Sequence, residues 1–340
     1  MPSEKQFEER IENINSIINH IRLNGAKSRR ELSCDLGLSW GCVSELSQIL
    51  IKKNIVTEEE PNNIKSKGRT PSLLVLNPDI CFLGIDINIR GLSACLCNLL
   101  GEKLESFSEK IDCSSKEGFI KSVKDFADSI ICNKTNIFGI GFAMQGIFSP
   151  ESNCWKFPSK NISINFSTDF IKDFNIPITV EHDPNCILYG CFNDTEKSKM
   201  IVRIDNGIGA SIHKKGEFVN ELLELGYFVV GSDNKRLHET LSLSKAQSFA
   251  SKKDLEEYLK SGGERLGTAL GNVCNLFRLD KIYLCGDMIT NYNLLNEAFF
   301  SSYKNTAIAA AEIITVEVTD AAYGAAKIAI DNFKYYFKEN

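Results

Sequence analysis

The sequence predicts an α/β protein in which a small, mainly helical N-terminal domain precedes a larger domain of two α/β lobes. Two short amphipathic segments joined by a glycine turn, within residues 28–53, indicate the helical domain. Beyond residue 72, short apolar runs alternate with amphipathic segments, as in α/β folds. A second series of such runs begins at Met200 and predicts the second lobe. The expected domains are residues 1–72 and 73–340, the latter with lobes at about 73–190, together with the C-terminal helix, and 191–325.

Composition is that of an ordinary soluble globular protein, with 43% hydrophobic and 24% charged residues and a net charge of −5. The N-terminus is polar and acidic, and no run of eighteen apolar residues occurs. A membrane span and a secretory signal are therefore not expected, which favours a cytoplasmic protein. The twelve cysteines are scattered through apolar runs and lie far from the four histidines. Reduced, buried thiols are expected, and neither a metal site nor a cofactor is predicted.

The N-terminal domain has the sequence signals of a helix-turn-helix. Ser28 can cap a short helix, and Glu31 completes a capping box. Gly37 permits a tight turn, and Ser39 can cap a second helix. The apolar positions of that second helix recur at helical spacing: Val43, Leu46, Leu50 and Ile51. In such a unit the second helix enters the major groove of DNA.

Flanking segments complete a winged helix. An amphipathic first helix is expected over residues 7–23, and residues 55–57 form a strand. The segment 65–71, KSKGRTP, is a glycine-containing loop with a basic tip, as in a wing. Residues 1–72 carry eleven Lys/Arg and ten Asp/Glu, whereas the rest of the chain is acidic. Local basicity on an acidic body favours DNA binding by this domain, although an αα-corner packing elsewhere, or a first helix used for dimerisation, would give similar patterns.

The exposed face of the second helix offers few strong base contacts. It lacks Arg and Lys in its first turns, so the commonest contact to guanine is missing. Ser44 can contact base edges, Glu45 can accept from cytosine, and Trp40 can meet a thymine methyl or simply pack. Phosphate contacts are expected from arginines at the domain's first short helix, and minor-groove contacts from the wing. The candidate DNA-binding residues are Arg29, Arg30, Ser39, Trp40, Ser44, Glu45, Lys67 and Arg69.

The larger domain shows alternating strand and helix patterns. Strands are expected at 73–76, 81–87, 91–98 and 103–111, and residues 116–132 carry apolar side chains at helical spacing. A buried strand follows at 136–143. In the second lobe, strands are expected near 200–205 and 281–286. Polar loops at strand ends imply a cleft between the two lobes.

Several short motifs together resemble the ROK family, which joins sugar kinases with sugar-kinase-like transcriptional repressors. The resemblance rests on their order along the chain: GRTP at 68–71, LGIDI at 83–87, GIGFAMQGIFSPESN at 139–153, EHDPN at 181–185, NGIGASI at 206–212 and LELGYFVV at 223–230. It implies a two-lobed actin-like, ribonuclease H-like ATPase fold behind the winged helix-turn-helix.

Departures from the family pattern point away from kinase activity. Family kinases carry D-x-G-G-T where this chain has Asp86–Arg90, so both glycines and the threonine are absent. Asp205 and Asn206 stand where kinases have Gly-Thr, and the adenosine-side cluster is reduced to residues 285–287. Since backbone N–H groups approach phosphates closely only where glycine leaves room, productive ATP binding is not expected.

The resemblance also implies a sugar site. Asp183 occupies the position of the family's catalytic base and could still accept a sugar hydroxyl, or could serve as a turn residue before Pro184. Tyr227 replaces the histidine that touches sugar and zinc in typical members, and the zinc cysteines are missing. Either the ligand differs from glucose-like sugars or the pocket is vestigial. The candidate sugar-binding residues are Asn161, Asp183, Asn185, Glu224 and Tyr227.

The resulting hypothesis is a DNA-binding transcriptional regulator, expected to repress carbohydrate-utilisation genes. Its expected partners are operator DNA and a small sugar effector, and the resemblance implies a homodimer formed through the C-terminal domain. The alternative is an active sugar kinase with an appended DNA-binding domain, which Asp183 favours and Asp86–Arg90 opposes. A third hypothesis is a DNA-binding protein whose interlobe cleft binds no ligand.

Overall fold

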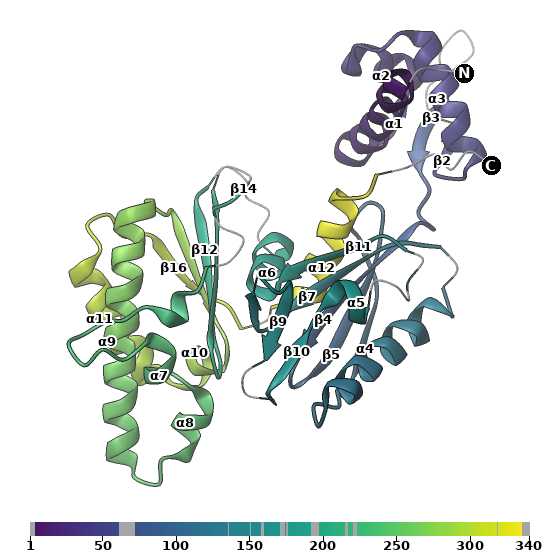
Figure 1. Ribbon diagram of the computed structural model, residues 1–340. Coiled ribbons are helices and arrows are strands. Elements are labelled where there is room, and N and C mark those ends of the chain that lie inside the picture. The colour runs from purple at the N-terminus through teal and green to yellow at the C-terminus, as the bar shows by residue number, and fades with distance from the viewer. Residues whose placement is uncertain are drawn as a thin grey trace.

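The computed structural model describes most of the chain in three parts, a small N-terminal domain and two lobes (Figure 1). It describes residues 4–60, 72–134, 136–149, 151–157, 160–170, 174, 176–191, 197–214, 217–219, 223–317 and 319–334. Within these ranges, no helix is both long enough and apolar enough to cross a membrane.

The N-terminal domain is a winged helix. Its helices are α1 (Glu4–Asn24), α2 (Arg29–Leu36) and α3 (Trp40–Lys52), and its strands are β1 (Lys27–Ser28), β2 (Val56–Glu59) and β3 (Leu73–Leu76). The three strands form an antiparallel sheet in the order β1-β3-β2. Isoleucines of α1 and the apolar face of α3 are buried together against this sheet.

Local signals set the helix boundaries as the sequence predicts. The Ser28 hydroxyl accepts from the Glu31 N–H at 3.3 Å, and Glu31 Oε2 accepts from the Ser28 N–H at 2.8 Å, so the capping box is formed. Gly37 ends α2 with φ at 66°, where glycine is favoured. The Ser39 hydroxyl then accepts from the Cys42 N–H at 3.2 Å and caps α3. The helix-turn-helix is therefore confirmed.

Strand β3 closes the wing sheet. The sequence places residues 73–76 at the start of the larger domain, but Thr57 and Glu58 pair with Val75 and Leu74, which puts β3 in the sheet of the winged helix. The segment 61–71 joins β2 to β3 along the chain, and it lies outside the described residues. The predicted wing contacts Lys67 and Arg69 fall in that segment.

The two lobes are built on the same plan. The first lobe has the strand order β11-β7-β4-β5-β6 and the second β16-β15-β12-β13-β14, with the antiparallel and parallel pairs in corresponding places. Strands of the first lobe are β4 (Cys81–Asn88), β5 (Gly91–Asn98), β6 (Lys103–Glu109), β7 (Ile137–Met144) and β11 (Ile178–His182). Those of the second are β12 (Lys199–Ile204), β13 (Ile208–Lys214), β14 (Glu217–Phe218), β15 (Lys281–Cys285) and β16 (Glu312–Thr315). This repeated order explains the repeated sequence pattern.

Smaller elements complete each lobe. The first lobe adds a three-stranded sheet of β8 (Ile147–Ser149), β9 (Cys154–Phe157) and β10 (Ile162–Ile164), with α4 (Lys116–Ile131), α5 (Phe166–Asp169) and α6 (Asp183–Cys191). The second adds the 3₁₀ helix η3 (Leu225–Tyr227), α7 (Leu237–Thr240), α8 (Leu243–Ser248), α9 (Lys252–Phe277), α10 (Asp287–Asn291) and α11 (Asn293–Thr306). Figure 1 shows α9 and α11 on the outer side of the second lobe, away from the first.

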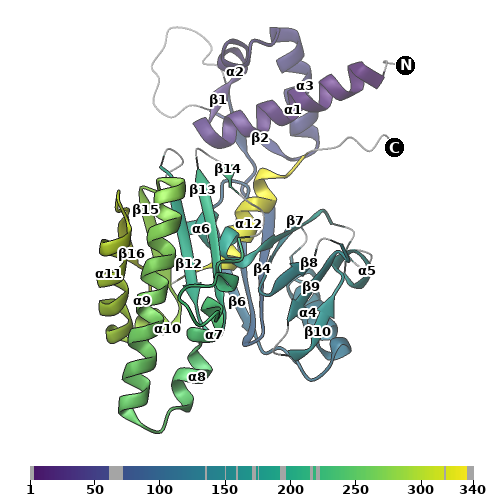
Figure 2. The same cartoon turned by 60° about the vertical axis from the view of Figure 1, so that its left-hand side comes forward.

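The C-terminal helix α12 (Ala321–Asp331) packs on the first lobe and reaches the winged helix (Figure 2). Glycines of the sheet allow a very close approach, since a Cβ at Gly84 would lie 1.8 Å from the Ala322 carbonyl oxygen. At its far end, Asp331 forms an ion pair with Arg22 of α1 at 2.6 Å. The winged helix therefore shares a hydrophobic core with α12 and the first sheet.

Candidate functional site

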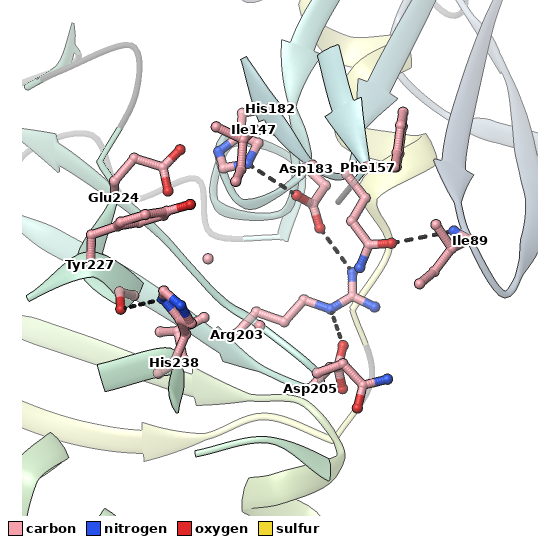
Figure 3. Close-up of a pocket in the computed structure, with 17 residues that line it drawn as sticks. Ile89, Ile147, Phe157, His182, Asp183, Arg203, Asp205, Glu224, Tyr227 and His238 are labelled. Atoms are coloured by element: carbon pink, nitrogen blue, oxygen red, sulfur yellow. Dashed lines mark hydrogen bonds and ion pairs between the residues drawn. The ribbon is translucent and has the colours of Figure 1, made fainter. Parts of the chain in front are cut away.

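A cavity of about 300 Å³ lies between the two lobes (Figure 3). The first lobe lines it with Ile89, Gln145, Gly146, Ile147, Phe157, His182 and Asp183. The second lobe lines it with Arg203, Asp205, Asn206, Gly207, Ile208, Gly209, Glu224, Gly226, Tyr227 and His238. A concave site with a few convergent polar groups is the usual form of a small-molecule pocket.

Asp183 lies in this cavity as the first residue of α6 and is only 4% exposed. Arg203 of β12 donates from Nη1 to Asp183 Oδ2 at 3.2 Å and from Nε to Asp205 Oδ2 at 2.9 Å. His182 Nε2 lies 3.6 Å from the other Asp183 oxygen. The carboxylate that the resemblance equates with a catalytic base is thus part of an ion-pair network.

Arg90 extends this network across the cleft. It lies at the turn between β4 and β5, and its guanidinium contacts Asp205 and Asp287 of the second lobe, each at 2.7 Å. Burial opposes ionisation of Asp205, but Arg203, the Asp287 N–H and Arg90 together lower the pKa of Asp205 below its ordinary value. Arg90 belongs to residues 86–90, the segment that departs from the kinase pattern. From this segment it joins the first lobe to the second.

Asp86 lies beneath this network in β4. Its Oδ1 has no hydrogen-bond partner in the described structure. Burial raises the pKa of the Asp86 carboxyl to about 7, and the nearby charge of Asp183 acts in the same direction. A carboxyl in such surroundings changes its charge near neutral pH.

Glu224 and Tyr227 lie at the two ends of η3 and face the cavity from the second lobe (Figure 3). Burial raises the pKa of Glu224, and the charges of His182 and His238 oppose this rise. Tyr227 is 41% exposed, and its ring lies edge-on to the His238 ring at 4.9 Å. The structure therefore brings the predicted residues Asp183, Glu224 and Tyr227 together.

The other two predicted sugar ligands do not line the cavity. Asn161 is exposed at the start of β10, with a left-handed φ of 52°. Asn185 is 1% exposed, and its Nδ2 donates to Glu181 Oε1 at 2.8 Å. These contacts support the turn from β11 into α6.

Two histidines of the cavity were not predicted from the sequence. His182 is 5% exposed, and its Nδ1 has no partner in the part of the chain that the structure describes. The sequence could have indicated His182 as a site residue, because it stands inside the EHDPN motif directly before Asp183. A lone histidine in the polar segment that follows Gly231 is expected to be solvated, whereas His238 is half-buried and lines the cavity. Buried Leu237 holds it there, since the Leu237 N–H donates to the Phe228 carbonyl at 2.8 Å.

Across the described ranges, no group of three or more His, Cys, Asp and Glu side chains is placed to hold a metal ion.

The candidate DNA-binding residues of the winged helix differ in their exposure and in their contacts. Trp40 is 63% exposed at the first turn of α3, Ser44 is half-buried, and exposed Glu45 pairs with Arg10 of α1. Exposed Gln48 lies four residues beyond Ser44 and so on the same face of α3.

The remaining predicted contacts surround that helix. Arg29 pairs with Glu58 of β2, whereas Arg30 is exposed. Ser39 is exposed, and its hydroxyl caps α3. Arg30, Ser39, Trp40 and Glu45 are thus the exposed residues among the predicted contacts that the structure describes.

Comparison with known proteins agrees with this architecture. No family model matches the chain. The xylose repressor of Bacillus spizizenii is 28% identical over 216 residues, which cover 58% of this chain and 53% of that protein. The chain spans about half the length of the curated relatives it matches.

Solved structures show the same fold. A crystal structure of a ROK family transcriptional regulator, a homologue of the E. coli MLC protein, matches with a TM-score of 0.73 at 18% identity, covering 95% of this chain and 96% of that one. A ROK family glucokinase from Streptomyces griseus, in complex with glucose and AMPPNP, matches 74% of this chain and 100% of its own length, with a TM-score of 0.57 at 14% identity. The resemblance that the motifs indicate is therefore confirmed, and the chain has the winged helix and two-lobed fold of a ROK family transcriptional regulator.

Proposed function

We propose that this protein is a transcriptional repressor of carbohydrate-utilisation genes, which binds operator DNA through its winged helix and a sugar between its lobes. The observation that carries the proposal is the combination of an exposed α3, headed by Trp40, with a polar interlobe cavity that contains Asp183 and Glu224. Acting on DNA, the protein would work in the cytoplasm as a homodimer.

The effector that fits best is a neutral sugar. Asp183 and Glu224 offer carboxylate acceptors for hydroxyl groups. The arginine in the cavity, Arg203, already donates to Asp183 and Asp205, so it is poorly available to a phosphate group. Because the curated relatives are xylose repressors, D-xylose is the first ligand to test.

The same contacts argue against phosphoryl transfer. A kinase needs glycines that admit the phosphates and a carboxylate free to take a hydroxyl proton. Here Arg90 occupies the altered first loop and pairs with Asp205, while Asp183 accepts from Arg203. The second candidate, an active sugar kinase, is favoured by the position of Asp183 in the cavity, and it requires these ion pairs to open for Mg-ATP.

Sugar binding would reach the DNA through helix α12. This helix contacts the first sheet closely at Gly84 and pairs with Arg22 of the winged helix. A sugar that binds one arrangement of the lobes more tightly shifts the population toward it. In a dimer, such a shift would alter the spacing of two recognition helices and hence their match to a palindromic operator.

The test combines DNA binding with sugar binding in the full-length protein. Fluorescence anisotropy would measure the affinity for operator-sized fragments from its own upstream DNA, with and without a panel of neutral sugars, amino sugars and sugar phosphates. Thermal unfolding with the same panel, with and without Mg-ATP, reports binding independently, because a ligand of the folded state raises the melting temperature.

A neutral sugar that raises the melting temperature and changes DNA affinity supports the proposal. DNA binding that no sugar alters would instead indicate a pocket without an effector. Formation of ADP with any sugar of the panel would establish the kinase alternative.

A further inference from the structure

We propose that His238 contacts the sugar directly and supplies the imidazole that is missing at position 227. This inference rests on the proposed function, in which the interlobe cavity binds a neutral sugar. The motif at 223–230 has Tyr227 where the resemblance predicts a sugar-contacting histidine. In the structure, an imidazole nevertheless lines the same wall of the cavity, and it comes from α7 (Figure 3).

The hydrogen bonding of His238 fixes its tautomer. Its Nδ1 lies 2.8 Å from the carbonyl oxygen of Gly226. A carbonyl oxygen can only accept, so Nδ1 carries a proton and donates it. In the neutral ring, Nε2 is then an acceptor.

The second ring nitrogen is available to a ligand. No hydrogen bond or ion pair joins Nε2 to any described residue, and His238 lines the cavity. The Gly226 carbonyl thus fixes the orientation of the ring through Nδ1. Metal-binding histidines are oriented in the same way, by a hydrogen bond to the nitrogen that does not bind the metal. The expected contact is a sugar hydroxyl that donates to Nε2.

The ring is also held in place by its neighbours. It lies edge-on to Tyr227, with the centroids 4.9 Å apart and an interplanar angle of 62°. Helix α7 is itself fixed by buried Leu237 and by Glu239, whose Oε2 accepts from the Arg236 N–H at 2.7 Å at the start of the helix. Such support keeps the imidazole ready for binding at a low entropic cost.

The neighbouring groups define the class of ligand. Glu224 and His238 both line the cavity from the second lobe (Figure 3). A carboxylate and an imidazole nitrogen on one wall offer two acceptors for hydroxyl groups. These two acceptors fit a neutral polyol that donates from at least two hydroxyl groups. D-xylose is such a polyol and serves as the probe.

Two substitutions separate a ligand contact from a structural role. In His238→Asn, the amide nitrogen can replace Nδ1 and keep the bond to Gly226, but nothing replaces Nε2. In His238→Gln, the amide reaches the position of Nε2 instead. The matched control is His20→Asn, because His20 lies on α1 and pairs with Asp35, outside the cavity.

Isothermal titration of the full-length protein with D-xylose provides the readout, with the melting temperature of each variant measured beside it. His238→Asn should weaken binding by about tenfold while its melting temperature stays near that of the wild type, as expected for the loss of one good hydrogen bond. His238→Gln should recover part of the affinity, and His20→Asn should bind as the wild type does.

The remaining outcomes overturn the inference in distinguishable ways. Unchanged affinity in His238→Asn would remove His238 from the sugar site and leave the proposed function standing. A lower melting temperature and weaker binding in His238→Gln, with both properties kept in His238→Asn, would assign His238 a structural role only. A wild-type protein that binds no neutral sugar would overturn the proposed function, and this inference with it.

Discussion

Arg90 of the first lobe and Asp205 of the second form an ion pair of 2.7 Å that bridges the cleft. Asp205 also accepts from Arg203, which in turn donates to Asp183 in the cavity. A continuous series of charged contacts therefore connects the cavity to the bridge between the lobes. A ligand that hydrogen-bonds Asp183 would act on one end of this series.

Breaking the ion pair between Arg90 and Asp205 should lower the stability of the protein without giving it kinase activity. Arg90→Ala should lower the free energy of unfolding by about 1 kcal/mol, because Arg90 is partly exposed and solvent weakens its pairs. It should not confer binding of Mg-ATP, since the glycines of a phosphate loop are still absent. Chemical denaturation and nucleotide titration check both statements. Lys252→Ala, a highly exposed site on α9, serves as the control.

Glu224→Gln should weaken sugar binding by about tenfold without lowering stability, because the half-buried carboxylate accepts strongly from hydroxyl groups and forms no ion pair in the described structure. Burial disfavours the charge, so the neutral amide should be tolerated in the folded protein. Titration calorimetry and thermal unfolding measure the two effects. A variant that unfolds at markedly lower temperature would contradict this account of Glu224.

Asp86 should make stability depend on pH near neutrality. Its folded-state pKa, about 7, exceeds the ordinary value of 3.8. The group therefore stabilises the fold fully below pH 3.8, and this contribution is lost as the pH rises through about 7. Unfolding between pH 5 and 9 should show a decline that is smaller in Asp86→Asn than in the wild type. Asp125→Asn, exposed on α4, should leave the decline unchanged.

Trp40 should matter for DNA and little for folding. Its side chain is 63% exposed on α3, so Trp40→Ala should leave the melting temperature within a few degrees of the wild type. Loss of an aromatic contact to DNA should lower operator affinity by about 5- to 150-fold, which corresponds to about 1–3 kcal/mol per good base contact. Anisotropy measurements test this. Leu276→Ala, at an apolar residue of α9 that is 76% exposed, is the control.

The contact between Arg22 and Asp331 should be needed for the sugar to affect DNA binding. Asp331→Asn should leave the affinity for sugar unchanged and reduce the change in DNA affinity that sugar produces, because the charged contact of α12 with α1 is broken. The exchange of both residues, Arg22→Asp with Asp331→Arg, should restore part of the response. Equal responses in the single variant and the wild type would exclude a role for this pair.

Local features of the fold could be predicted from the sequence because their causes are local. The capping box of Ser28 and Glu31 and the turn at Gly37 depend on residues within a few positions of one another. The repeated strand pattern likewise predicted two lobes. Membership of β3 in the wing sheet could not be predicted, because it depends on pairing with β2 across the intervening segment 61–71.

The candidate site was predictable only in part, for the same reason. Motif positions identified Asp183, Glu224 and Tyr227, which the structure brings together. The role of Arg203 depends on β12 lying opposite α6, which no local pattern encodes. His238 reaches the cavity because a backbone bond folds α7 against η3, so its apparent place in a polar loop was misleading.

The close packing of α12 on the first sheet has a consequence for the order of synthesis. A Cβ at Gly84 or Gly141 would collide with the α12 backbone, so that face of the sheet is complete only when residues 321–331 are in place. The winged helix leaves the ribosome before the two lobes, and the helix that fastens it to them emerges after both. Under the proposed function, a C-terminally truncated chain would retain the winged helix but lose the α12 contacts through which a bound sugar is proposed to act on it.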